Sequence, residues 1–371
     1  MTATGATLGP PRPSPLREFG ASIATIMVKE LRSRMRGRRA FVVLTIYLAL
    51  LALITYGAYL IVAPNAQANF GGFGGQAANA SGIIGQTIFS LLSIFQLILV
   101  CFIAPGFTAG QISLEREKQT LDLLVSTPMR PGAIVIGKLA AALAFVVLMI
   151  VAAVPITAIV LMYGGASFDD IVRQQLVLLS TAIVLGAIGL FFSALLKRTQ
   201  AATVLTYITM LGLTVGTVML FGFWTLLVNQ GDGGFVVGPP KRAPEQLLYL
   251  NPGVAMLDVV GNTEPGGFGG INALLGQLRG DAPDFGGGMD CLGDVCRPVD
   301  QFGNPVENAV DAGSGYWWPR IAISSVLAAV LLTFASTRLV VPAGMRWALR
   351  RRPSRPAAAE TGFEELGEIE P

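Results

Sequence analysis

The chain has 371 residues, of which 53% are hydrophobic and only 13% are charged, and its mean hydropathy is +0.62. This composition is too apolar for an ordinary soluble domain and indicates a polytopic membrane protein. The net charge of +3 excludes little by itself, but the positions of Lys and Arg along the chain carry information on topology.

The first element in chain order is a polar tail, residues 1–17, which we expect to be disordered. It lacks the basic-then-apolar order of a signal peptide, so the first apolar segment is expected to stay in the protein. Residues 18–39 predict an amphipathic helix at the membrane surface, because apolar residues recur every four positions and basic residues lie opposite. The apolar stripe is Phe19, Ile23, Met27, Leu31 and Met35, and the basic side is Lys29, Arg32 and Arg36. Glu30 falls on the apolar stripe, so an ordinary basic flank of the first span is the alternative.

Six apolar runs are each long enough to cross a bilayer, which takes about 20 residues. They lie at about 40–62, 83–107, 133–163, 176–196, 201–228 and 318–341. Basic residues gather at alternate ends of these runs, as at Arg38 and Arg39 before the first and Lys197 and Arg198 after the fourth. The positive-inside rule then places both termini in the cytoplasm. The sequence therefore predicts an all-α membrane domain over residues 40–341, with a long external segment at 229–317 and a disordered cytoplasmic tail at 342–371.

Between the second and third spans lies a charged segment on the predicted cytoplasmic side. Helical spacing places Leu114, Leu121, Leu124 and Val125 on a packing face and Arg116, Gln119, Thr120 and Leu123 on the opposite face. The second face could enter a groove on another protein, with Glu115, Arg116 and Glu117 setting the register by charge complementarity. Thr127 and Pro128 are expected to end this helix. The alternative is a connector helix that rests on the bilayer surface.

Several kinds of chemistry are disfavoured. The chain has no histidine, which removes the usual general base and the commonest metal ligand, so we predict neither catalytic residues nor a metal site. Residues 132–138 have the spacing of a phosphate-binding loop, but Leu139 stands where Ser or Thr is needed and no strand precedes them. Lys138 is instead expected to extend to lipid headgroups. The spans hold no charged residue near mid-depth, which disfavours an ion-driven transporter.

Polar residues inside the spans are predicted to form hydrogen bonds between helices. They are Gln86, Ser90, Ser93, Gln96, Thr181, Thr203, Thr206 and Thr209. Cys101 lies in the second span, whereas Cys291 and Cys296 lie in the external segment, where an oxidising environment favours a disulfide over two free thiols. Two short apolar pieces of that segment, residues 245–260 and 271–278, are expected to be interfacial or re-entrant helices.

The residues from Leu114 to Pro128, LEREKQTLDLLVSTP, followed by Gly137-Lys138-Leu139, resemble the permease subunits of the type 2 ATP-binding-cassette exporter family. The resemblance extends to the basic amino-terminal helix and to residues 249–253, while the long insert at 262–315 departs from it. It implies a coupling helix between spans two and three that contacts a separate cytoplasmic ATPase subunit. The contact residues it implies are Glu115, Arg116, Glu117, Thr120, Leu123, Thr127 and Pro128.

The resemblance also implies a second permease subunit, identical or different, and a chain that binds no cofactor itself, since ATP and Mg belong to the ATPase. We therefore expect a non-catalytic permease subunit of an ATP-driven exporter in a bacterial plasma membrane, surrounded by lipids and without a nucleic-acid partner. Its substrate stays open. The alternative function is a membrane scaffold or sensor that binds a cytoplasmic partner through residues 115–128 without transport.

Overall fold

The computed structural model describes residues 15–35, 38–70, 77–120, 131–229, 245–261, 289–292, 295–298 and 317–340. Within these ranges, six helical segments are long and apolar enough to cross a membrane, which confirms the predicted six-span helical fold. They are α2 (Arg38–Phe70), α3 (Ala77–Thr108), α6 (Pro131–Ile159), α7 (Phe168–Leu195), the broken pair α8 (Thr199–Leu211) and α9 (Thr217–Asn229), and α12 (Trp317–Val340).

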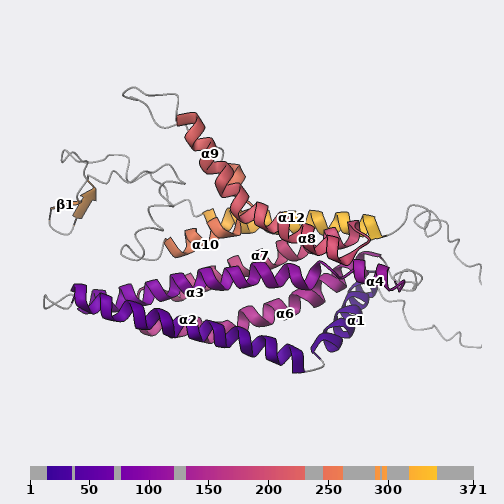
Figure 1. The fold of residues 1–371 in the computed structure, drawn as a ribbon, viewed down its shortest axis with the longest axis horizontal. Helices are drawn as coiled ribbons and strands as arrows, with labels where there is room; N and C mark the ends of the chain where they lie inside the picture. Colours follow the sequence, from indigo (N-terminus) through magenta and orange to yellow (C-terminus); the bar gives the residue numbers. More distant parts are fainter. Residues whose placement is uncertain are drawn as a thin grey trace, which may run out of the picture.

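The spans lie side by side in an elongated bundle (Figure 1). Helix α1 (Pro15–Met35) and the short helix α4 (Ser113–Glu117) lie at one end of the bundle, which we call the α4 end. Helix α10 (Pro252–Gly261) lies towards the opposite end, which we call the α10 end. The described residues also include three short helical turns: η1 (Val160–Met162), the π-helical turn η2 (Gly212–Gly216) and η3 (Glu245–Leu248).

Helix α7 is the centre of the bundle, because most of its length is buried and its side chains pack on α3, α6 and α12. Leu178, Leu185 and Leu190 are fully buried there. By contrast, α2, α9 and α12 present rows of large apolar side chains to their surroundings. That pattern suits helices in a lipid or protein environment rather than in water.

Helix α7 begins eight residues before the predicted start at Leu176, because residues 167–170 form a capping box. Ser167 Oγ accepts a hydrogen bond from the Asp170 amide, and Asp170 Oδ2 accepts one from the Ser167 amide. The pattern Ser-x-x-Asp is readable in the sequence as a helix start, and the prediction from hydropathy alone missed it.

The six serine and threonine hydroxyls that were predicted to join neighbouring helices bond within their own helix instead, so that prediction is wrong for them. Ser90, Ser93, Thr181, Thr203, Thr206 and Thr209 each donate to the carbonyl four residues earlier in their own helix. An apolar interior offers a hydroxyl few other acceptors, so the carbonyl of the preceding turn is the nearest partner. The prediction is confirmed for Gln96, whose Oε1 accepts from Gln174 Nε2 of α7 at 3.1 Å.

The predicted external segment is only partly described. Residues 245–261 form η3 and α10, as expected for an apolar piece of this length, while the piece at 271–278 lies outside the described residues. A β-hairpin of β1 (Met289–Leu292) and β2 (Val295–Pro298) was not predicted. Its antiparallel register pairs Cys291 with Cys296, so their backbones are adjacent, and the disulfide stays a prediction.

Candidate functional site

Helix α4 follows the second span, and its first turn is held by α7. The amides of Ile112 and Ser113 donate to Ser193 Oγ at 2.8 and 3.0 Å, and Ser193 is fully buried. A helix of five residues is too short to be stable alone, since helix formation carries a large nucleation cost. The fourth span therefore supplies the acceptor that fixes where α4 begins.

The helix ends sooner than predicted. Gln119 adopts a left-handed backbone with φ +56°, and the amide of Thr120 donates to the Glu115 carbonyl at 2.9 Å. A single helix through the whole charged segment is therefore wrong, because a left-handed residue ends the helical hydrogen-bond ladder. Leu114, expected on the packing face, is 42% exposed. Leu121, Leu123, Leu124, Val125, Thr127 and Pro128 lie outside the described residues.

Glu117 connects α4 to the fifth span. Its Oε1 accepts a hydrogen bond from the backbone amide of Thr199, the first residue of α8, at 2.7 Å. The first amides of a helix lack internal partners and carry the positive end of the helix dipole. A carboxylate at this point satisfies one amide and is favourably placed in that field. The predicted contact residue Glu117 thus has a partner within its own chain.

Glu115 takes part in a charge cluster with Glu30 of α1 and Lys138 of α6. Lys138 Nζ donates to Glu115 Oε1 at 2.6 Å and to Glu30 Oε1 at 3.2 Å. The Lys138 side chain is 3% exposed, so the expectation that it extends to lipid headgroups is wrong. A buried ammonium is costly unless it is paired, and two carboxylates pair it here. We call Glu30, Glu115 and Lys138 the charge cluster.

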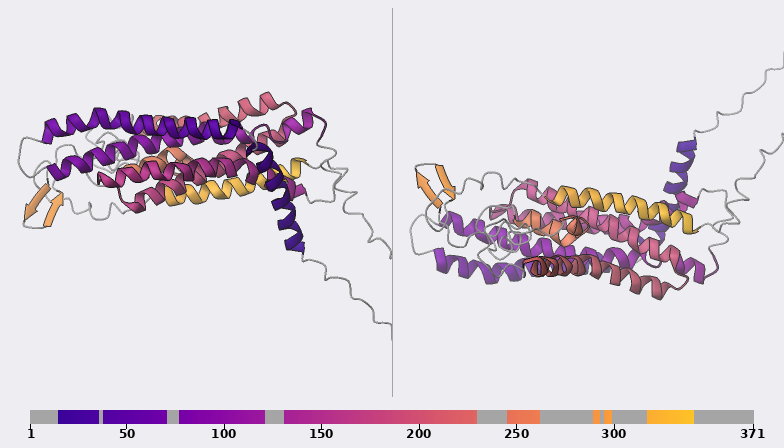
Figure 2. Two further views of the ribbon diagram at one scale, coloured as in Figure 1. Left: turned by 90° about the horizontal axis from the view of Figure 1, so that it is seen from below. Right: turned by 90° about the horizontal axis from the view of Figure 1, so that it is seen from above.

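The charge cluster explains why Glu30 interrupts the apolar stripe of α1. The face of α1 that carries Glu30 packs on α6, where Ile26 is buried. Gly137 permits this close approach, because a Cβ atom there would lie 2.9 Å from the Ile26 Cβ. Helix α1 leaves the bundle at a steep angle to the spans (Figure 2). The predicted amphipathic helix is present, and its place at a membrane surface stays a prediction.

Three elements therefore bond directly to α4: α7 through Ser193, α8 through Thr199 and α6 through Lys138. Helix α1 is linked to α4 indirectly, because Glu30 bonds to the same Lys138. Of the other predicted contact residues, Arg116 is half-buried and Thr120 is exposed. Sequence reasoning did not identify Ser193 or Thr199. The sequence did contain a signal for the charge cluster, since Glu30 and Lys138 are residues of opposite charge that each lie on an apolar helix face.

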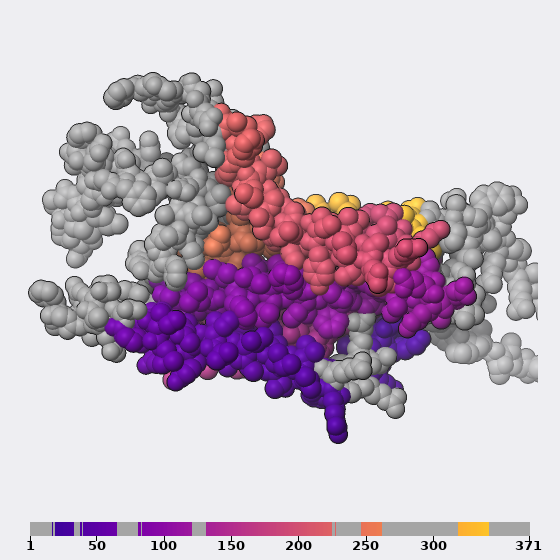
Figure 3. Space-filling model, viewed as in Figure 1, coloured from indigo at the N-terminus to yellow at the C-terminus, as the bar shows by residue number. Residues whose placement is uncertain are grey.

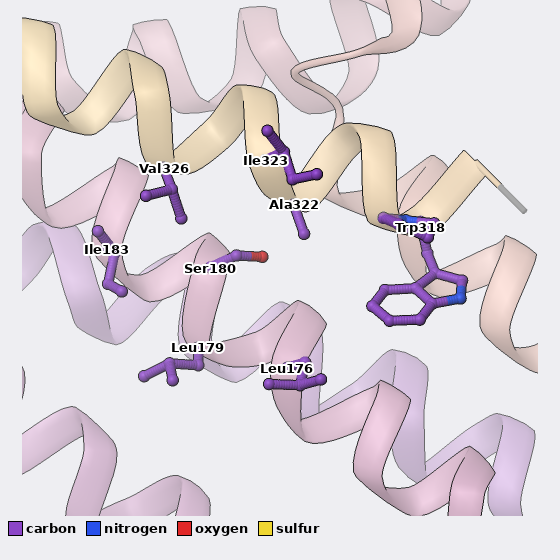
Figure 4. Close-up of a pocket in the computed structure, with 9 residues that line it drawn as sticks. Leu176, Leu179, Ser180, Ile183, Trp318, Ala322, Ile323 and Val326 are labelled. Carbon is purple, nitrogen blue, oxygen red and sulfur yellow. The ribbon is translucent and has the colours of Figure 1, made fainter.

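A second feature is an apolar groove of about 380 Å³ between α7 and α12, shown in Figure 4. Leu176, Leu179 and Ile183 line it from α7, and Trp318, Ala322 and Val326 are among its residues on α12. The hydroxyl of Ser180 points into the groove but donates to the carbonyl of Val177. The groove can accommodate hydrocarbon, and it contains no charged side chain that would orient a polar molecule.

Among the described residues, no three His, Cys, Asp or Glu side chains gather as metal ligands would.

Comparison with known proteins identifies the family to which this chain belongs. The family model described as ABC-2 family transporter protein matches residues 24–335, which include α4, the charge cluster, five whole spans and most of the sixth. Comparison with curated proteins found no match. Because the family match covers most of its length, the chain belongs to the ABC-2 family of transporter proteins and is a membrane permease.

Proposed function

We propose that this permease is the membrane-spanning subunit of an ATP-driven exporter and that a separate ATPase subunit acts on it at α4. The single observation that supports this proposal is the junction at α4, where one short helix is bonded to α6, α7 and α8 and is linked through Lys138 of α6 to α1. A force on α4 would reach four helices at once. Closure of an ATPase pair would then shift the permease between inward-facing and outward-facing arrangements.

The charge distribution supports a cytoplasmic α4 end. Arg38, Arg116, Lys118, Lys197 and Arg198 all belong to segments at that end of the bundle. The positive-inside rule favours the cytoplasmic side for such a concentration in short loops. We accordingly propose a multi-pass protein of a bacterial plasma membrane with both termini in the cytoplasm. ATP and Mg would be bound by the ATPase subunit.

The contacts with the ATPase would involve the surface that α4 leaves free. Glu115 is bonded to Lys138 and Glu117 to Thr199, so these two residues would position α4 as well as contribute charge at its surface. Thr120 is exposed beyond the end of α4 and Arg116 is half-buried. The resemblance adds Leu123, Thr127 and Pro128 to this surface. A second permease subunit, identical or different, would cover part of the exposed apolar faces of the outer spans.

The test is co-purification of the ATPase with the permease. Thr120→Asp combined with Leu123→Asp should reduce the amount of ATPase that co-purifies and leave the amount of permease in the membrane unchanged. The matched control is Met162→Asp, because Met162 is 86% exposed in the turn after α6, far from α4 along that span. Equal recovery of ATPase with both variants, or none with the unmodified permease, would contradict the proposal.

The same complex distinguishes transport from a scaffold role. Reconstituted in vesicles with its ATPase, an exporter should change conformation when ATP is added, and the change should require the coupling surface. A scaffold should instead form a stable complex whose permease conformation is the same with and without nucleotide.

A further inference from the structure

The fifth span is broken in its middle. Helix α8 ends at Leu211, a π-helical turn occupies Gly212–Gly216, and α9 continues from Thr217. Single π turns bend helices and often occur at functional positions. A Cβ atom at Gly212 or Gly216 would meet nothing within 4 Å, so these glycines are not required for close packing. Their effect is to weaken the helix locally, by about 1 kcal/mol each relative to alanine.

Beyond this break, α9 diverges from the bundle. It rises from the body at an angle to α8 (Figure 3), and Met219 and Phe223 on it are 70% and 59% exposed. A helix with few packing partners beyond a weak turn can change its angle at little cost. The angle of α9 therefore depends on contacts other than those that stabilise the rest of the bundle.

Asn251 bonds directly to the break. Its Nδ2 donates to the carbonyl of Thr214, inside the π turn, at 2.8 Å and to Thr217 Oγ1, the first residue of α9, at 2.7 Å. Its Oδ1 accepts from the amides of Gly253 and Val254 at the start of α10. The side chain is fully buried and uses both donors and both acceptor positions of its amide.

Helix α10, which directly follows Asn251, is itself buried in the bundle and bonded to α12. Most of its residues are buried, and Asp258, also fully buried, accepts from the backbone amide of Trp318 at the start of α12 at 2.9 Å. Just before α10, the carbonyl of Tyr249 accepts a hydrogen bond from Ser324 of α12. Helix α10 is thus fastened to the sixth span, and Asn251 extends that attachment to the break in the fifth.

We propose that Asn251 is a positioning residue that latches the break in the fifth span to α10 and so sets the angle of α9. When the latch is closed, α9 keeps one orientation relative to α12. When its two donor bonds break, α9 turns about residues 212–216. The role of this movement in transport rests on the proposed function, whereas the latch itself can be tested without a substrate.

The experiment measures the distance from α9 to α12 by electron paramagnetic resonance in the full permease in lipid nanodiscs. Spin labels are placed at Leu227 and Arg320, both exposed, in a background without the three native cysteines. The test variant is Asn251→Asp. Aspartate still caps α10 through its carboxylate, but it cannot donate to the Thr214 carbonyl or to Thr217.

With Asn251→Asp, the distance distribution should become at least twice as broad or shift to a new maximum. Thr217→Val removes one of the two acceptors while keeping Asn251 and should give a smaller change in the same direction. The control is Thr203→Ala, whose lost hydroxyl bonds only to its own helix, and it should leave the distribution unchanged.

An unchanged distribution in both Asn251→Asp and Thr217→Val would overturn the latch, as would an equal broadening in Thr203→Ala. Co-purification of the ATPase is measured on the same samples and should be the same for all variants, because the latch lies at a distance from α4. If no ATPase co-purifies with the unmodified permease, that result would count against the proposed function. The result for the latch would still stand.

Discussion

Replacing Lys138 with methionine should weaken the contact between α1 and the bundle, because it removes the only cation of the charge cluster. Methionine keeps a long unbranched side chain at a position that is 3% exposed, so the substitution changes charge far more than volume. Glu30 and Glu115 would then face each other across the position that Nζ now occupies.

The size of the effect follows from the geometry. The two carboxylate oxygens lie 3.2 and 2.6 Å from Nζ, so they are at most about 6 Å from each other. At an effective dielectric constant of about 20, two unit charges at that separation or closer repel by at least about 3 kcal/mol. Each carboxylate side chain is 25% exposed, so hydration relieves part of this repulsion. We expect a net destabilisation of the α1 contact of about 2 kcal/mol, which is a factor of about 30 in its opening equilibrium.

Hydrogen exchange of the α1 amides measures this equilibrium directly. In Lys138→Met, exchange in α1 should be about 30-fold faster than in the unmodified permease, with little change in α7. Adding Glu30→Gln removes the repulsion between the two carboxylates, so the double variant should recover most of the loss. Lys118→Met, an exposed lysine beside α4, is the control. Exchange in α1 that is the same in Lys138→Met and in this control would refute the reasoning.

Three further substitutions test the contacts of α4 and α1. Ser193→Ala leaves two buried amides without an acceptor and should cost about 1–3 kcal/mol, measured as a lower thermal midpoint, whereas Ser180→Ala should not. Gly137→Ala should cost about 1–3 kcal/mol by overpacking against Ile26, whereas Gly20→Ala on α1, where a Cβ atom would meet nothing within 4 Å, should not; an equal cost at both positions would contradict the overpacking. Glu117→Gln should speed amide exchange in the first turn of α8, and an unchanged rate there would show that the carboxylate does not stabilise that turn.

The sequence by itself determined the number of spans and the family resemblance. A bilayer sets a minimum length for an apolar helix, and every backbone group inside it must be bonded within its own helix. Both requirements act on contiguous residues, so they can be read along the chain. The start of α7 was also readable, since Ser167 and Asp170 form a local capping box.

Only the tertiary structure decided which residues form the junction at α4 and the latch at α10. Lys138 meets Glu30 across 108 positions of sequence, and Asn251 meets Thr214 across 37. These pairs depend on where helices cross, and the pattern of any one helix does not contain that information. The sequence could show that Glu30 and Lys138 each needed a partner on an apolar face, because an unpaired buried charge is costly. It was the packing of α1 and α4 on α6 that determined which partner each one has.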